Sequence, residues 1–303
     1  MGVELKVAEH NFPEIAVLLA THNPTNVIKE QIDSIYAQEL VKVKVYWGDD
    51  RSNEETKIYI RSLLAGRNYV EISNTRIGAT KNFLHLLRFP TEEYIAFSDQ
   101  DDIWLPRKLA QHIQLLKTSS DIPALSHSNS LLLIHGEKKT KNPTCGTHGF
   151  LEMSWQNCVQ GCTMVINSKA QRLMNAMPQK YVLAHDWWAA LVVSLAGEIR
   201  FNNNTDTMYR IHEGNLIGDP SSLERLVNIF KQKSGTRTKQ FLEILNSIDL
   251  KEIKSDNQLG SAQDYWNNIL KGSRLKIGVS DKKRRIKISE DIIRRITLIF
   301  RSP

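Results

Sequence analysis

Features that assign a chain to a specialised class of protein are scarce in these 303 residues. The three cysteines are too few, and odd in number, for a disulfide framework, and Cys158 and Cys162 lack the histidines of a zinc site. We therefore expect reduced thiols. No apolar run approaches the roughly 18 residues of a membrane span, and residues 1–11 lack the apolar core of a signal peptide. The sequence thus predicts a cytoplasmic protein.

A net positive charge is also absent over most of the chain. The formal net charge is +7, but residues 271–303 hold 11 basic and 3 acidic side chains, which leaves residues 1–270 at −1. Enzymes that act on nucleic acids usually surround their site with positive charge, so no nucleic-acid partner is expected.

Apolar runs alternate with helical patterns along the first two thirds of the chain. Strands are predicted at 15–20, 41–47, 69–72, 93–97, 123–134, 161–166 and 198–201, and helices at 27–36, 55–64, 80–87, from 106 and at 186–196. This order predicts an α/β domain with a mainly parallel sheet over residues 1–220. Only helical patterns follow, which predicts a helical C-terminal region over residues 221–303.

Acidic residues follow two of the predicted strands, at the sheet edge where such folds bind ligands. Asp99, Asp101 and Asp102 would repel one another unless a cation such as Mg²⁺ or Mn²⁺ lies between them. The alternative is a solvated turn in which Asp102 caps the next helix. Asp49 and Asp50 could bind a base or ribose, or form a turn.

Two further motifs carry ionisable groups. Asp186 stands at the head of an apolar helix, where it could act as a general base or as a cap. The neighbouring Trp187 could stack on a sugar or belong to the core. Arg210 and His212 lie two residues apart on one strand face. They could clamp a diphosphate, or Arg210 could form a structural ion pair.

The sequence also lacks the phosphate-binding loops of other nucleotide enzymes. It has neither the GxGxxG of dinucleotide oxidoreductases nor the GxxxxGK[ST] of NTPases. What is present resembles, in order, the motifs of family 2 glycosyltransferases, and most closely their bacterial rhamnosyltransferase-like branch. The matching stretches are 20–24, 49–50, 97–104, 161–164, 185–188 and 209–212, within about residues 14–218.

The resemblance implies a GT-A fold, a nucleotide-sugar donor and a role for each matching residue. Thr21 and Asp50 would bind the nucleotide, and Asn82 would lie near the donor. The DxD motif would be Asp99 and Asp101, with Asp101 the first choice as metal ligand. By the same resemblance Asp186 would be the catalytic base, and Arg210 and His212 would be neighbours of the diphosphate. Trp187, from its place beside Asp186, is predicted as a substrate-binding residue.

The resemblance further implies inverting transfer of a sugar, with rhamnose as a candidate, to a glycan or polyprenyl-linked glycan. The QxxRW motif of processive synthases is missing, which favours transfer of one or a few sugars. Two other classes stay open. A sugar nucleotidyltransferase would need a glycine-rich basic loop after the first strand, and residues 21–26 contain neither glycine nor a basic residue. A non-catalytic membrane or nucleic-acid binding protein is suggested only by the basic tail.

That tail contains an amphipathic pattern. Its apolar positions share one helix face and are Ile292, Ile293, Ile296, Ile299 and Phe300. A basic helix of this kind can dock on an anionic membrane surface, which would make the protein peripheral on the inner face of the plasma membrane. The alternative is that the face packs on the body of the protein or on a second subunit in a homodimer.

Overall fold

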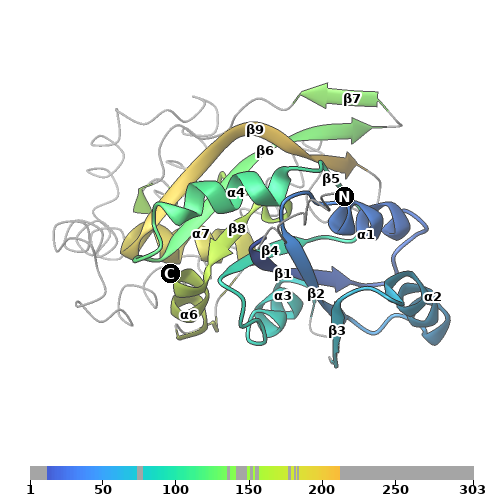
Figure 1. Ribbon diagram of the computed structural model, residues 1–303. Coiled ribbons are helices and arrows are strands. Elements are labelled where there is room, and N and C mark those ends of the chain that lie inside the picture. The colour runs from blue at the N-terminus through green and yellow to red at the C-terminus, as the bar shows by residue number, and fades with distance from the viewer. Residues whose placement is uncertain are drawn as a thin grey trace, which may run out of the picture.

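The computed structural model describes residues 12–73, 78–134, 137–140, 149–150, 153, 157–176, 179–180, 182 and 184–211. These residues form one nine-stranded sheet with the path β3-β2-β1-β4-β8-β6-β9-β5, and β7 pairs with β6. Helices cover both faces of the sheet (Figure 1). The predictions for His212 and for the C-terminal region 221–303 lie outside the described residues.

The strands mostly run in one direction, which confirms the prediction of a mainly parallel sheet. Parallel pairs join β1 to β2, β1 to β4, β2 to β3 and β6 to β9, while β8 is antiparallel to both β4 and β6. Strands β5 and β7 also run against their partners. The strand bounds are β1 Glu14–Thr21, β2 Lys42–Asp49, β3 Tyr69–Ile72, β4 Tyr94–Ser98, β5 Ile103–Trp104, β6 Ala124–Ile134, β7 Glu137–Thr140, β8 Val165–Asn167 and β9 Glu198–Ile211.

Strand β1 separates two hydrophobic cores, one on each face of the sheet. Its side chains alternate: Val17 and its neighbours two residues away pack with α1, α2 and α4, whereas Leu18 packs with α3, α6 and α7. Burial on both faces explains why this strand is an uninterrupted apolar run. The helix bounds are α1 Ile28–Tyr36, α2 Glu54–Leu64, α3 Ala79–Leu86, α4 Lys108–Lys117, α6 Ser168–Ala176 and α7 His185–Ala196.

The structure differs from the predictions in several local features. The strand expected over 161–166 begins with a 3-10 turn, η1 Gly161–Thr163, and only then becomes β8. Helix α6 and the short strands β5 and β7 were not predicted. The prediction of reduced thiols was wrong for Cys158, which is disulfide-bonded, because an odd number of cysteines still permits one pair. Cys162 is free and buried.

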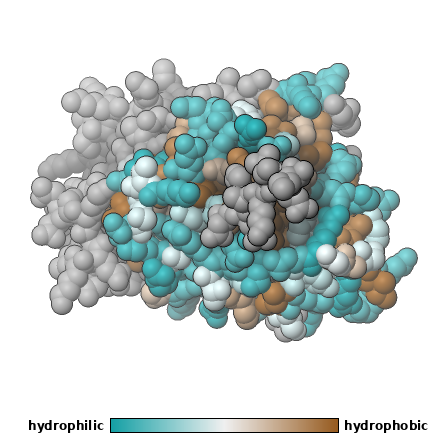
Figure 2. All heavy atoms as spheres, in the orientation of Figure 1, coloured by the Kyte–Doolittle hydropathy of each residue, from teal (hydrophilic) through white to brown (hydrophobic). Residues whose placement is uncertain are grey.

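The visible surface of the described residues is largely hydrophilic, with hydrophobic side chains near α2 (Figure 2). The most exposed apolar side chain of α2 is Ile58, which is 62% exposed. Within the described ranges, no helix is long and apolar enough to span a bilayer.

Candidate active site

The sheet register brings the sequence-predicted residues to one edge. Thr21, the last residue of β1, pairs with Asp49 at the end of β2, and Leu19 pairs with Ser98 at the end of β4. The loops after these strands are tied together, because the His22 amide donates to Gln100 Oε1 at 2.8 Å and Gln100 Nε2 donates to the His22 carbonyl at 3.2 Å. The Asp49-Asp50 turn and the acidic loop after β4 therefore belong to one site.

The two carboxylates after β2 have different surroundings. Asp49 is an internal acceptor: its Oδ2 accepts from Thr21 Oγ1 at 2.8 Å and from Ser52 Oγ at 2.7 Å. Thr21 is itself buried and its hydroxyl accepts from Trp47 Nε1 at 2.9 Å. Thr21 thus fixes the end of the strand, and its predicted contact with a nucleotide remains a prediction.

Asp50 faces the start of α3. Its Oδ2 accepts from the Gly78 amide at 3.0 Å, while its own carbonyl lies 2.7 Å from His22 Nδ1. Arg51 has φ of +59°. This left-handed conformation favours glycine, so a non-glycine residue is strained at this turn. The turn presents Asp50 at the sheet edge, where the resemblance places the nucleotide.

Asn82 holds α3 against β2. Its side chain is 1% exposed, and Nδ2 donates to the Gly48 carbonyl at 2.9 Å. A Cβ at Gly48 would lie 2.8 Å from Asn82 Oδ1, so this close approach requires glycine. Asn82 therefore positions the strand end that precedes Asp50, and a direct contact with the donor remains a prediction.

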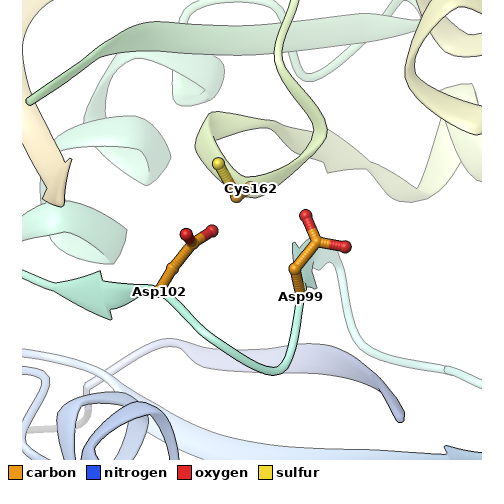
Figure 3. A group of neighbouring side chains, drawn as sticks. All are labelled: Asp99, Asp102 and Cys162. Carbon is orange, nitrogen blue, oxygen red and sulfur yellow. The ribbon is translucent and has the colours of Figure 1, made fainter. Parts of the chain in front are cut away.

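The acidic loop after β4 forms a cluster with a thiol. One oxygen each from Asp99 and Asp102 and the sulfur of Cys162 all lie within 4.8 Å of one another, and we call these three residues the acidic cluster. Both carboxylates extend from the loop between β4 and β5 toward η1, which carries Cys162 (Figure 3). Asp101, the first choice from sequence, is not a member of this group. Of the three carboxylates that the sequence offered, the structure thus groups Asp102 with Asp99 as candidate ligands.

The acidic cluster is electrostatically costly without a cation. Burial, followed by the charges of Asp102 and Asp101, raises the pKa of Asp99 well above its usual value. Burial and Asp101 raise the pKa of Asp102 to about 7. Asp102 Oδ1 accepts from the Arg210 amide at 3.3 Å, whereas Oδ2 is buried and no nitrogen or oxygen donor within the described part of the chain reaches it. An orphaned carboxylate oxygen beside a second carboxylate fits a hard divalent cation.

Asp186 lies in the first turn of α7 with its carboxylate fixed by two backbone amides. Oδ2 accepts from the Gly161 amide at 3.2 Å, and Oδ1 accepts from the Trp187 amide at 2.6 Å. Burial outweighs these bonds and raises the pKa of Asp186 to about 6. Its charge also contributes to the raised pKa of Asp99, so the two carboxylates share one site. A partly buried carboxylate with this pKa can accept a proton near neutral pH.

The neighbours of Asp186 are packing residues. His185 packs against Phe83 and Phe97, with ring centroids 4.1 and 5.4 Å away, and burial lowers its pKa to about 3. Trp187 is partly buried and donates from Nε1 to the Met153 carbonyl at 2.6 Å. Its predicted contact with substrate stays a prediction.

Arg210 joins the acidic loop to α1. Its Nε donates to the Asp101 carbonyl at 3.1 Å, and one terminal nitrogen pairs with Glu30 Oε2 at 2.9 Å. Both interpretations of Arg210, as a structural ion pair and as a diphosphate clamp, are therefore compatible with its position. The ion pair with Glu30 exists, and the guanidinium lies beside the acidic loop. Glu30 itself was not predicted.

Sequence reasoning missed a buried ionic network behind the acidic cluster. Lys108 of α4 donates to the Cys162 carbonyl and, at 2.6 Å, to Thr207 Oγ1, and it lies 3.9 Å from Asp206 Oδ1. Asp206 Oδ2 is 2.9 Å from His112 Nε2. The available signal was weak: Lys108 and His112 are spaced i, i+4 directly beside the apolar stripe of α4.

The parallel half-sheet with acidic strand ends, together with the partly buried carboxylate of Asp186, is the arrangement expected of a GT-A type glycosyltransferase. Residues 16–132 match the family described as Glycosyl transferase family 2. The chain therefore contains a family 2 glycosyltransferase domain over these residues and is an enzyme that transfers sugars.

Two curated proteins illustrate the similarity. The dTDP-rhamnosyl transferase RfbG of Shigella flexneri is 27% identical over 272 residues, which cover 83% of this chain and 91% of that protein. The UDP-Glc:alpha-D-GlcNAc-diphosphoundecaprenol beta-1,3-glucosyltransferase WfaP of Escherichia coli is 24% identical over 223 residues, which cover 72% of this chain and 85% of that one.

Solved structures show the same fold. S. aureus TarS 1-349 in complex with UDP-GlcNAc superposes with a TM-score of 0.59 and 16% identity, over 94% of this chain and 81% of that chain. A longer TarS structure gives a TM-score of 0.57 at 13% identity, and this chain covers 48% of it. The GT-A prediction is therefore confirmed at the level of the fold.

Proposed function

We propose that this protein is an inverting glycosyltransferase that moves a sugar from a nucleoside diphosphate donor to a hydroxyl of a bacterial surface polysaccharide or its lipid-linked precursor. Asp186 accepts the proton of the acceptor hydroxyl. The oxygen then bonds to the anomeric carbon from the face opposite the leaving group, the bond between that carbon and the diphosphate oxygen breaks, and the configuration inverts.

The position of Asp186 carries this proposal. Its carboxylate is held by the Gly161 and Trp187 amides, has a pKa of about 6, and acts electrostatically on Asp99. A base with this pKa is largely ionised at neutral pH and is still basic enough to take a proton in the transition state. Arg210, over the acidic loop, would offset the charge that develops on the departing diphosphate.

The acidic cluster supports a metal-dependent reaction. A bound Mg²⁺ or Mn²⁺ would be held by Asp99 together with Asp101 or Asp102, and would supply positive charge beside the diphosphate. The chain's own residues would do the remaining work. Thr21, Asp50 and Asn82 would hold the nucleotide side of the donor.

The relatives guide the choice of substrates. RfbG is named for a dTDP-rhamnosyl transfer and WfaP for transfer to a diphosphoundecaprenol-linked sugar. We therefore propose dTDP-rhamnose as the first donor to test and a polyprenyl-linked glycan as the acceptor. An acceptor of that kind would bring the protein to the cytoplasmic face of the membrane, where residues 271–303 would bind anionic lipid. Trp187 and His212 stay candidates for the acceptor and the diphosphate, respectively.

The test is a donor screen with the full chain, using dTDP-rhamnose and UDP-hexoses with a synthetic polyprenyl-linked acceptor. We expect release of free nucleoside diphosphate that requires one donor and is abolished by excess EDTA. Asp101→Asn and Asp102→Asn, compared at several Mg²⁺ concentrations, identify the second ligand, because only that variant needs more Mg²⁺. Release of pyrophosphate from a nucleoside triphosphate would instead indicate a nucleotidyltransferase, and full turnover in EDTA would refute the metal dependence.

A further inference from the structure

Cys162 brings a soft donor atom into the acidic cluster. Its sulfur lies within 4.8 Å of a carboxylate oxygen of Asp99 and of one of Asp102. Tetrahedral ligand atoms bonded to one ion at about 2.0–2.3 Å lie roughly 3.3–3.8 Å apart. Small side-chain rotations would therefore place all three donors around a single ion. Figure 3 shows the two carboxylates and the thiol gathered between the acidic loop and η1.

Asp102 provides a second observation that points to a ligand. The residue is 0% exposed, and no nitrogen or oxygen donor among the residues that the structure describes reaches its Oδ2, which leaves the Cys162 thiol as the donor beside the carboxylate. A buried carboxylate whose second oxygen has at most a weak thiol donor costs free energy that a cation would recover. Asp99 is partly exposed, so an ion can enter from the side of the acidic loop.

We propose that Cys162 is a third protein ligand of this site, so that the site takes a soft divalent cation, such as Zn²⁺, Cd²⁺ or Co²⁺, through sulfur. Mg²⁺ prefers oxygen ligands and would leave the thiol protonated, whereas a softer ion binds the thiolate and releases its proton to solvent. Soft ions would therefore compete with Mg²⁺ and inhibit transfer. This inference deepens the proposed function, because both concern the same metal position.

The proposal is tested by binding, without turnover. The full chain is freed of metal and titrated with Co²⁺ or Cd²⁺ in a buffer without thiols, while the thiolate-to-metal charge-transfer absorption is recorded. We expect the wild type to show this absorption. Cys162→Ser should lose it and bind Cd²⁺ at least about tenfold more weakly, since even outer-sphere changes have effects of that size. Its affinity for Mg²⁺ should change by less than about twofold.

Met164→Leu is the matched control, because it also removes a buried sulfur, two residues along the chain from Cys162, and should leave the absorption unchanged. Absence of the absorption in wild type at saturating Cd²⁺, or its persistence in Cys162→Ser, would overturn the proposal. Should Cys162→Ser not fold, Cys162→Ala decides: loss of the charge-transfer absorption supports the thiolate ligand, and its persistence overturns it. Turnover without the absorption refutes this inference alone, whereas the absorption without turnover on any donor refutes the proposed function alone.

Discussion

At the scale of single residues, Asp186 combines a fixed orientation with a raised pKa. Asp186→Asn keeps the shape of the side chain but cannot accept a proton. We expect kcat to fall by at least about a hundredfold, the lower scale for a general base, with donor affinity nearly unchanged. Steady-state kinetics and donor titration separate the two effects. Loss of donor binding with kcat retained would show that Asp186 is only a helix cap.

The pH dependence of the reaction follows from the same group. Burial raises the pKa of Asp186 from 3.8 to about 6, and only the ionised carboxylate can act as base. We therefore expect kcat to fall tenfold for each pH unit below about 6 and to level off above it. The measurement is kcat from pH 5 to 8 at saturating Mg²⁺. A kcat that stays constant down to pH 5 would contradict the assignment of Asp186 as the base. The residual kcat of Asp186→Asn should no longer fall at acidic pH.

At the scale of elements, the contact between η1 and α7 depends on Gly161. A Cβ there would lie 2.6 Å from His185 Nε2, and the imidazole cannot yield because Phe83 and Phe97 lie against it. Gly161→Ala should cost about 1–3 kcal/mol of stability, as overpacking does, and displace the amide that holds Asp186. We expect a lower kcat together with a lower Tm.

Gly66→Ala is the control for that substitution. Gly66 has φ of +76° and no heavy atom within 4 Å of the added Cβ, so the change introduces backbone strain of about 1 kcal/mol without a steric clash. Its Tm should fall while kcat is unchanged. If Gly161→Ala behaves in the same way, the η1–α7 contact does not position the base.

The buried network of Asp206 connects α4, β6 and β9 and should make stability depend on acid. Asp206 is 2% exposed, and the charges of His112 and Lys108 overcome its burial and lower its pKa from 3.8 to about 2. Because the folded pKa is the lower one, this stabilisation is complete above about pH 4 and is lost as pH falls toward 2. Its size is about 2 kcal/mol.

Urea unfolding of wild type and Asp206→Asn between pH 7 and 2 measures this contribution. We expect the variant to be less stable at pH 7, and the gap between the two free energies of unfolding to shrink by about 2 kcal/mol as pH falls below 4. A gap that stays constant with pH would mean that Asp206 stabilises the fold only through packing.

The same elements show how far the sequence predicts the structure. The continuous apolar run of β1 and the helical period in α1 are local signals, so β1 to β4 and their helices were predicted nearly to the residue. The insertion of β8 between β4 and β6 is a long-range pairing that no local pattern encodes. For the same reason the meeting of Asp102 with Cys162 could not be predicted, although both lie in matched motifs.

At the scale of the whole molecule, charge is divided between a nearly neutral body and a basic tail. Residues 1–270 carry a net charge of −1, and residues 271–303 carry +8. Each basic residue close to an anionic surface contributes about 1 kcal/mol of attraction, which is screened by salt. The distribution favours a membrane-docking tail, which would bring the site to a lipid-linked acceptor.

A flotation assay tests this tail with the full chain and a version that ends near Gly272. We expect the full chain to float with liposomes that contain anionic lipid, and binding to fall as salt rises, because the attraction is between charges. Neutral liposomes and the shortened chain should both fail to float. Replacing Ile296 and Ile299 with serine removes apolar contacts and leaves every charge in place, so it separates insertion from simple attraction. Equal flotation of the full and shortened chains would refute membrane docking. Unfolding on truncation, or conversion of a dimer to a monomer, would show that the apolar face packs on protein instead.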